Sequence, residues 1–412
     1  MNKFQTFVSY VRYNGIKSAF KRSLAYFKRK ITHAPIVQDV VSKRPIDVMT
    51  SAEDVVHADF VNNPYRPPNK IIQSILRIGW VLSPISIGSG GQSTIARFAR
   101  YLQQQGHKVT FYIYESISEQ PAVVSHQILK EHFNIDVRCV PISQASLDSL
   151  DVIFATGWET AYPVFNLKTN AHKMYFVQDF EPLFYGTGSK SVLAENTYRF
   201  GFYGVTAGRW LTKKVGEYGM PADFFDFGAD LDIYRAKGQI RKKKQICFYA
   251  RPVTERRAFE IGILALTRFN RNHPDYDIVC FGWDVSDYDI PFPYENRGIV
   301  KPEELASIYH DSVACLVLSL TNASLLPMEL LAAGCIPVMN EGENNEMVIG
   351  DNPDIIYTLN SPIELAKGLE KAVNNSDIND VCEKMSQRVE SASWQLSYEK
   401  FEEIILREVT LR

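Results

Sequence analysis

The sequence lacks a run of about 20 apolar residues that could cross a membrane, and its N-terminus lacks the apolar core of a signal peptide. Both absences predict a cytoplasmic protein. A strong charge of one sign is also missing, because 45 Lys and Arg residues balance 47 Asp and Glu residues for a net charge of -2. The chain therefore lacks the positive field of a nucleic-acid-binding protein, and we expect no nucleic-acid partner.

Metal-binding and disulfide patterns are missing as well. The six cysteines form no C-x-x-C pair and the eight histidines show neither H-x-H nor H-E-x-x-H spacing. Five cysteines lie in or beside apolar runs, which predicts reduced packing residues. Three D-x-D triplets occur, at 230–232, 275–277 and 287–289, and such a pair holds a divalent cation in some sugar transferases. Triplets this short arise easily by chance, so we expect no metal and no other cofactor.

Length and composition indicate a globular protein of at least two domains. The chain has 412 residues, of which 45% are hydrophobic and 22% are charged. These values lie far from the low hydrophobicity and high charge of disordered chains, and a domain commonly has about 150 residues.

We expect residues 1–70 to form an extension ahead of these domains. Positions 1–30 contain eight Lys or Arg residues, no acid, and aromatic and aliphatic residues at helical spacing. This basic amphipathic segment either packs on the protein, including on a second subunit of a homodimer, or lies on an anionic membrane surface. Five prolines between 34 and 70 indicate a linker or an extended strap.

From residue 71 onward, short apolar strands alternate with amphipathic helices. This order predicts two doubly wound Rossmann-like α/β domains that face each other across a cleft, with ligand at the carboxyl ends of their strands. The first would span 71–225 together with a final helix in 393–412, and the second 226–392. Strands are expected at 77–82, 109–114, 152–155, 174–177, 203–206, 245–250, 278–281, 314–319 and 336–339, and helices at 93–105, 257–270, 302–310, 325–333 and 398–409.

A glycine-rich loop, Gly88-Ser89-Gly90-Gly91, follows the first strand and opens a helix. It resembles part of a dinucleotide fingerprint, although the third glycine of that pattern is absent. The same loop can bring backbone N–H groups close to a diphosphate or a sugar. A tight turn with no ligand is the remaining interpretation.

Three arginines follow the strand at 245–250. Arg251 comes directly after it, and Arg256 and Arg257 open the next helix. Guanidinium groups pair bidentately with phosphate oxygens, so this cluster suits a diphosphate leaving group. The alternative is a solvated group of charges.

A second candidate site runs from Ser319 to Val338. A strand ends at Ser319, a helix begins near Ser324 with Pro327 in its first turn, and Gly334 ends it. Free N–H groups at Ser324, Leu325 and the next residue would hold a phosphate, and Glu329 could accept hydrogen bonds from sugar or ribose hydroxyls. Alternatively, Glu329 only complements the dipole of its own helix.

Taken in order, these motifs resemble the GT-B glycosyltransferases of retaining family 4, and closely the bacterial rhamnosyltransferases of the WsaF type that build surface-layer glycans. The resemblance covers about 75–410 and rests on Gly90-Gly91, Gly106-His107-Lys108-Val109, Phe227-Gly228-Ala229-Asp230, Ala250-Arg251 with Arg256, Gly298-Ile299-Val300 before Lys301, and Glu329 to Val338. It implies a nucleotide-sugar donor, dTDP-L-rhamnose in the nearest relatives, held mainly by the second domain, without a metal. The implied donor-binding residues are Gly90, Gly91, Arg251, Arg256, Arg257, Lys301, Thr321, Ser324, Leu325 and Glu329.

Two positions depart from the family pattern. The family often has E-x7-E, but Thr321 stands where the first Glu would be, eight residues before Glu329. The usual His of the first domain is replaced within Gln178-Asp179. Asp179 is our candidate for an acid near the reacting centre, beside Arg251 and Glu329, and a purely structural hydrogen-bonding role is the alternative.

By this resemblance we expect a retaining rhamnosyltransferase that extends a bacterial surface glycan on a lipid-linked acceptor. For segment 1–30, a peripheral membrane contact and packing on protein both stay open. Two other functions stay open: an NAD(P)-dependent oxidoreductase, and a non-catalytic scaffold of a glycan-assembly complex.

Overall fold

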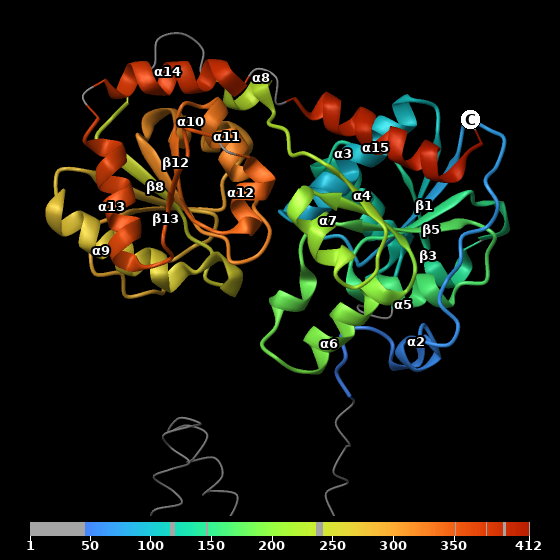
Figure 1. Cartoon of the computed structure of the whole chain (residues 1–412). Coiled ribbons are helices and arrows are strands. Elements are labelled where there is room, and N and C mark those ends of the chain that lie inside the picture. The colour runs from blue at the N-terminus through green and yellow to red at the C-terminus, as the bar shows by residue number, and fades with distance from the viewer. Residues whose placement is uncertain are drawn as a thin grey trace, which may run out of the picture. The chain divides into compact units, whose positions relative to one another are not determined.

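Two parallel sheets organise the chain in the computed structural model (Figure 1). The structure describes residues 46–115, 120–145, 147–235, 242–350, 352–375, 377–389 and 393–411. The basic segment 1–30 lies outside these ranges, so both interpretations of it stay predictions. None of the helices in the described ranges is long and apolar enough to cross a bilayer.

The first sheet and the elements packed on it form what we call the first lobe, residues 48–228 and 393–411. Its strands are β1 (Arg77–Leu82), β2 (Lys108–Ile113), β3 (Arg138–Pro141), β4 (Val152–Ala155), β5 (His172–Val177), β6 (Tyr203–Ala207) and β7 (Ala222–Phe225). Its α-helices are α2 (Ala52–His57), α3 (Gly90–Gln104), α4 (Ala122–His132), α5 (Trp158–Asn166), α6 (Ser189–Asn196), α7 (Arg209–Gly216) and α15 (Trp394–Val409). Short 3₁₀ turns are η2 (Ile142–Gln144), η3 (Leu147–Ser149), η4 (Glu181–Phe184) and η5 (Thr197–Arg199).

The second lobe, residues 229–389, is built in the same way. Its strands are β8 (Gln245–Tyr249), β9 (Asp277–Phe281), β10 (Glu295–Gly298), β11 (Ala314–Val317), β12 (Ile336–Asn340) and β13 (Ile356–Thr358). Its helices are α8 (Leu231–Tyr234), η6 (Glu255–Arg257), α9 (Phe259–Asn272), α10 (Pro302–Asp311), α11 (Leu326–Ala332), α12 (Glu343–Ile349), α13 (Pro362–Val373) and α14 (Ile378–Arg388).

Both sheets are doubly wound, which confirms the predicted fold class. The first has the strand order β3-β2-β1-β4-β5-β6-β7 and the second β10-β9-β8-β11-β12-β13, and all pairs of neighbouring strands are parallel. The order therefore reverses between β1 and β4 and again between β8 and β11. Ligands of such sheets bind outside the carboxyl ends of the strands at these reversals.

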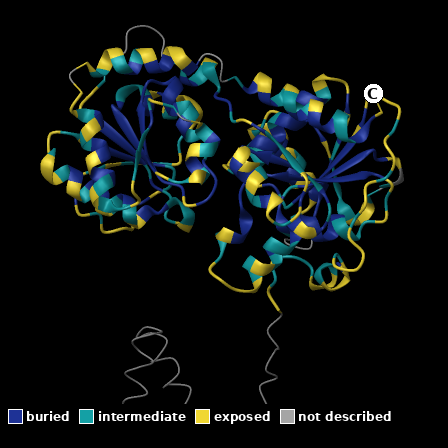
Figure 2. Ribbon diagram, viewed as in Figure 1, coloured by how far each residue is buried: buried dark blue, intermediate teal, exposed yellow. Residues whose placement is uncertain are grey.

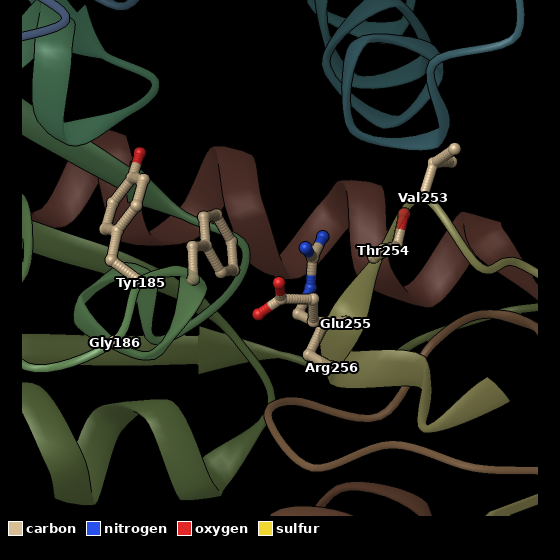
Figure 3. A pocket seen from close by; sticks show the side chains of 7 residues that line it. Tyr185, Gly186, Val253, Thr254, Glu255 and Arg256 are labelled. Atoms are coloured by element: carbon tan, nitrogen blue, oxygen red, sulfur yellow. The ribbon is translucent and has the colours of Figure 1, made fainter. Parts of the chain in front are cut away.

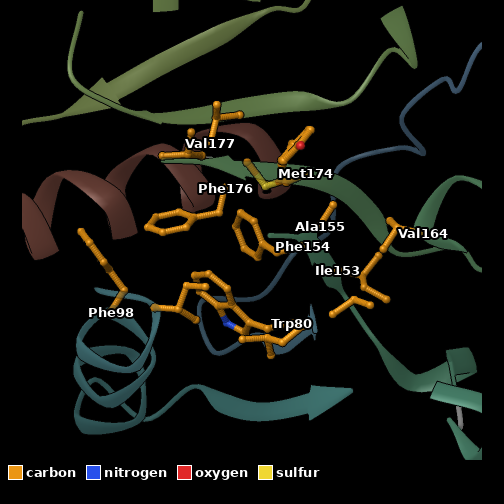
Figure 4. Packing of buried hydrophobic residues seen from close by; sticks show 14 of the residues in the cluster. Trp80, Phe98, Ile153, Phe154, Ala155, Val164, Met174, Phe176 and Val177 are labelled. Atoms are coloured by element: carbon orange, nitrogen blue, oxygen red, sulfur yellow. The ribbon is translucent and has the colours of Figure 1, made fainter. Parts of the chain in front are cut away.

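The first lobe has an aromatic core (Figure 4). Trp80 of β1 stacks on Phe154 of β4 with 4.6 Å between ring centroids and meets the ring of Phe176 of β5 at 5.3 Å. Phe401 of α15 closes this cluster, 4.6 Å from Phe98 of α3. Helix α15 thus returns from the end of the chain to pack on the first sheet, and buries the apolar stripe that the sequence assigned to it.

The second core contains five of the six cysteines. Cys247, Cys280, Cys315, Cys335 and Cys382 are all fully buried in it. The burial of these five free thiols confirms the predicted packing role, whereas Cys139 is half-buried. Figure 2 shows the strands of both lobes as buried, with exposed residues on the surrounding helices.

The segment before β1 is partly helical, where the sequence predicted a linker or strap. Ser51 caps α2 by accepting a hydrogen bond from the backbone N–H of Asp54. The segment is tied to the first lobe, because Tyr114 Oη donates to Asp54 Oδ2 at 2.7 Å and the Tyr65 N–H donates to the Phe200 carbonyl at 2.9 Å.

Candidate active site

The carboxyl edge of the second sheet carries the three predicted arginines. Arg251 follows β8 at the reversal point, and its Nε donates to Thr254 Oγ1 at 3.1 Å. Arg256 and Arg257 lie in η6, and Arg257 Nη1 donates to Ser319 Oγ, at the end of the neighbouring β11, at 2.8 Å. Burial lowers the pKa of Arg257, and the positive charges of Arg256 and Arg251 lower it further. The negative charge of Asp179 opposes this shift, so Arg257 lies near charges of both signs.

Asp179 is the acid that approaches this cluster from the first lobe. It follows β5, is 8% exposed, and accepts hydrogen bonds on both carboxylate oxygens. The backbone N–H groups of Phe180 and Asn322 donate to Oδ1 at 2.8 and 2.9 Å. Thr321 Oγ1 donates to Oδ2 at 3.0 Å, and Arg256 Nε lies 3.2 Å from the same oxygen. One carboxylate thus joins residues of both lobes.

Asn322 adds a second connection between the lobes. Its Nδ2 donates to the backbone carbonyl of Gln178 at 3.1 Å and to that of Ala207 at 2.9 Å. Both carbonyls lie at the carboxyl ends of first-lobe strands. Thr321 and Asn322 are each 1% exposed, so this turn after β11 is held by the first lobe and shielded from water.

Helix α11 begins slightly later than predicted, at Leu326, with Leu325 at the N-cap position. Ser324 precedes it, and the Ser324 Oγ is buried with no hydrogen-bond partner among the described residues. Pro327 lies in the first turn and Gly334 follows the helix with a φ of 68°, as the sequence predicted.

Glu329 is in the first turns of α11, beside an ion pair. Arg97 of α3 pairs through two hydrogen bonds with Asp230, at the start of α8. Burial raises the pKa of Glu329 to about 7, and the negative charge of Asp230 raises it while Arg97 opposes the shift. Glu329 therefore titrates near neutral pH instead of staying fully ionised.

The carboxyl edge of the first sheet holds the glycine loop and further acids. Gly90 and Gly91 begin α3, and a Cβ on Gly91 would come within 3.4 Å of the Gln178 amide. After β5, Glu181 accepts a hydrogen bond from the Trp158 N–H at 2.6 Å. Burial raises the pKa of Glu181 well above its usual range, and the charge of Glu159 adds to this shift.

A pocket of about 380 Å³ opens beside Arg256 (Figure 3). Figure 3 shows Tyr185 on one side, Val253 and Thr254 on the other, and Arg256 with Glu255 between them. Its first-lobe wall is η4 and the residues after it, and its second-lobe wall is η6 and the residues before it. The guanidinium of Arg256 lies 4.0 Å from the ring centroid of Phe184, in contact distance for a cation–π interaction.

The structure joins some of the predicted residues by direct contacts and leaves others apart. Asp179, Thr321 and Arg256 form one network, and Arg251 and Arg257 belong to the same cationic cluster. Lys301 lies elsewhere on the edge, exposed, as the N-cap residue of α10. Glu329 interacts with the Arg97–Asp230 pair, and no hydrogen bond joins it to Asp179 in the described part of the chain.

Sequence reasoning missed Asn322, Phe184 and Glu181. Asn322 stands inside the motif quoted after β11, and its only local signal is an amide at a strand end. Glu181 and Phe184 belong to segment 179–184, where an acid beside a proline after a strand was the available signal.

Comparison with known proteins identifies the family. A model described as "WsaF, N-terminal domain" matches residues 120–206, and one described as "WsaF, C-terminal domain" matches 244–370. The two matches fall on the two lobes in the expected order, and together they cover just over half of the chain. The chain belongs to the WsaF family.

One curated relative of this WsaF family member is the O-antigen biosynthesis protein RfbC of Myxococcus xanthus. The two are 28% identical over 334 residues, which make up 78% of this chain and 26% of RfbC. The chain thus spans about a quarter of the length of that relative.

Solved structures share the fold. Sucrose-phosphate synthase of Thermosynechococcus elongatus aligns with a TM-score of 0.63 at 11% identity, and covers 81% of this chain and 99% of its own. A glycosyltransferase of Rickettsia africae gives 0.59 at 14% identity with the same coverage, 81% and 99%. HepE of Anabaena, solved with UDP and glucose, gives 0.57 at 12% identity, again over 81% and 99%. The WsaF family member therefore has the GT-B fold.

Proposed function

We propose that the protein is a glycosyltransferase that moves a sugar from a nucleoside diphosphate onto a growing bacterial surface glycan. The donor we propose is dTDP-L-rhamnose, transferred with retention of anomeric configuration and without a metal. The acceptor would be lipid-linked, and segment 1–30 would bring the protein to the membrane that holds it.

One observation carries this proposal: Arg251, Arg256 and Arg257 all follow β8 at the carboxyl edge of the second sheet, where its strand order reverses. The charges of Arg251 and Arg256 act on Arg257, and Asp179 of the first lobe pairs with Arg256. A diphosphate carries the opposite charge and offers oxygens for bidentate pairing, so it would balance this cluster. The buried hydroxyl of Ser324, which has no partner among the described residues, is a further donor next to Leu325 at the start of α11.

The chemistry that this arrangement favours is departure of the nucleoside diphosphate. The bond between the anomeric carbon and the phosphate oxygen breaks, and its electron pair moves onto the diphosphate. Arg251 and Arg256 would stabilise that charge as it develops. The acceptor hydroxyl oxygen bonds to the same face of the anomeric carbon and gives its proton to the leaving phosphate, so no separate protein base is required.

The remaining predicted residues take roles around this centre. Glu329 would accept hydrogen bonds from ribose or sugar hydroxyls, and Thr321 would lie near the donor sugar. Gly90 and Gly91 would let the backbone at the start of α3 approach the donor from the first lobe. Lys301 is exposed on the second-lobe edge, so we expect it to contribute least to donor binding among these residues.

The relatives support the same class of reaction. HepE binds UDP and glucose in its solved structure, and RfbC is described as an O-antigen biosynthesis protein. Membership in the WsaF family and the GT-B fold agree with such a donor and such a product.

The test is a titration of the full chain with dTDP-L-rhamnose, dTDP, UDP-glucose and NADH, followed by a transfer assay. We expect a nucleotide sugar to bind and to release its nucleoside diphosphate when a lipid-linked glycan is added, with and without EDTA. Anomeric configuration of the product is read by NMR. Binding of NADH with no binding of any nucleotide sugar would replace this proposal by an oxidoreductase, and an inverted product would refute retention.

A further inference from the structure

Arg256 differs from Arg251 and Arg257 in the lobe that supplies the contacts of its guanidinium group. Arg251 bonds to Thr254 and Arg257 to Ser319, both in the second lobe. The described residues of the second lobe give the Arg256 guanidinium no hydrogen bond. Its contacts are Asp179 Oδ2 at 3.2 Å and the ring of Phe184 at 4.0 Å, and both belong to the first lobe.

The same carboxylate also fixes the turn after β11. Thr321 Oγ1 and the Asn322 N–H donate to opposite oxygens of Asp179, and the Leu320 N–H donates to the Arg256 carbonyl at 2.9 Å. Arg256 and the turn at 320–322 are thus connected to each other and to Asp179. With three hydrogen-bond donors and the Arg256 ion pair around its two oxygens, Asp179 has little capacity left for a substrate hydroxyl.

We propose that Asp179 is a positioning residue that fixes Arg256 and the Thr321–Asn322 turn across the two lobes. This inference rests on the proposed function, because it assigns Arg256 the role of a diphosphate ligand that is in place only when the lobes are in contact. Arg251 and Arg257 are held inside their own lobe and stay ordered without Asp179. The sequence left two roles open for Asp179, an acid near the reacting centre and a structural hydrogen-bonding residue. The geometry favours the second role, in which loss of Asp179 weakens donor binding through Arg256.

A pair of double-mutant cycles tests the proposal in the full chain, with affinity for dTDP and dTDP-L-rhamnose measured by calorimetry. Asp179→Asn and Arg256→Gln should each weaken binding about tenfold, because the ion pair between these two residues is lost in both. If Asp179 acts through Arg256, the double variant should be weakened about tenfold to twentyfold only. Asp179→Asn combined with Arg251→Ala should instead be close to multiplicative, because Arg251 has its own partner.

Asp151→Asn is the matched control. Asp151 is 7% exposed and also pairs with an arginine, Arg77, at 2.8 Å, but it lies at the amino end of β4. This variant loses a similar ion pair and should keep the affinity within about twofold. Hydrogen exchange at 319–325 should accelerate in Asp179→Asn and stay unchanged in Asp151→Asn.

The outcomes separate the two proposals. If wild-type protein binds none of the nucleotides, the proposed function fails before any variant is compared. If wild type binds and the Asp179–Arg256 cycle is multiplicative, or Asp179→Asn binds like wild type, the positioning role is wrong. Should Asp179→Asn fail to fold, Asn322→Asp, which removes the donor to the Gln178 and Ala207 carbonyls, takes its place with the same expected loss.

Discussion

The carboxyl edges of the two sheets differ in the ionisable side chains that they carry. The first presents the acids Asp179, Glu181 and Glu159, whereas the second presents Arg251, Arg256 and Arg257. Arg251 and Arg257 bond to hydroxyl groups of their own lobe, but Arg256 pairs with Asp179 of the first lobe. The comparison therefore shows that one acid of the first edge holds one cation of the second in place.

The cores beneath the two edges differ as well. Aromatic rings of β1, β4, β5 and α15 stack on one another in the first, while the second mixes aromatic rings such as Phe248 and Phe281 with five buried cysteines. The largest effect that we predict is therefore structural. Phe401→Ala should destabilise the protein by ~3–5 kcal/mol, because a fully buried ring that contacts Phe98 and Phe176 leaves a cavity. Urea unfolding measures the loss of unfolding free energy. Phe401→Leu should lose less than half as much of it as Phe401→Ala. Equal losses in the two variants would place α15 outside the first core.

The next prediction removes one cation of the second edge. Arg251→Ala should weaken binding of a nucleotide sugar by about tenfold to a hundredfold, as expected for a lost charge-assisted hydrogen bond of ~1.5–3 kcal/mol. Calorimetry gives the affinity. Arg388→Ala removes an arginine of the same lobe that pairs with Asp354 at 2.8 Å, and it should bind donor like wild type. Equal losses in both variants would mean that net charge, not position, attracts the ligand.

Glu329 is an acid in the lobe that carries the three arginines, and its titration can be tested. Its folded pKa of about 7 lies above its ordinary value of 4.5. The folded state therefore binds more protons between these values, and stability falls as pH rises from about 4.5 to 7. Glu329→Gln should remove this fall and raise the unfolding free energy at pH 8 by ~1–3 kcal/mol. Urea titrations at pH 5 and pH 8 measure it, with Glu370→Gln in α13 as the control, and an unchanged slope would show that Glu329 is solvated.

The smallest effect belongs to Lys301. It is exposed, and its charge is free to move in water, so Lys301→Ala should change donor affinity by about twofold at most. A loss as large as that of Arg251→Ala would require the donor to extend along the edge past β10.

Local patterns account for what could be predicted from the sequence. Strands β1 and β4 were placed correctly, because a parallel strand buried on both faces is a continuous apolar run. The arginines after β8 followed from the rule that ligands bind at the carboxyl ends of strands. The four edge strands β3, β7, β10 and β13 were all missed, since each has only three or four residues and none is a continuous run of fully buried apolar residues.

The contacts between the lobes could not be predicted. Asp179 and Asn322 are separated by 143 positions, and no periodicity links residues that far apart. A single Asp after a strand is compatible with a catalytic acid and with an anchor alike. Only the placement of Thr321, Asn322 and Arg256 around its two oxygens distinguishes these roles.

The most direct measurement is a structure of the protein with an intact nucleotide sugar. We predict the diphosphate within hydrogen-bond distance, about 3 Å, of the guanidinium groups of Arg251 and Arg256, with Asp179 still paired with Arg256. A diphosphate bound at the Gly90–Gly91 loop, with no contact to Arg251 or Arg256, would contradict the proposed donor site.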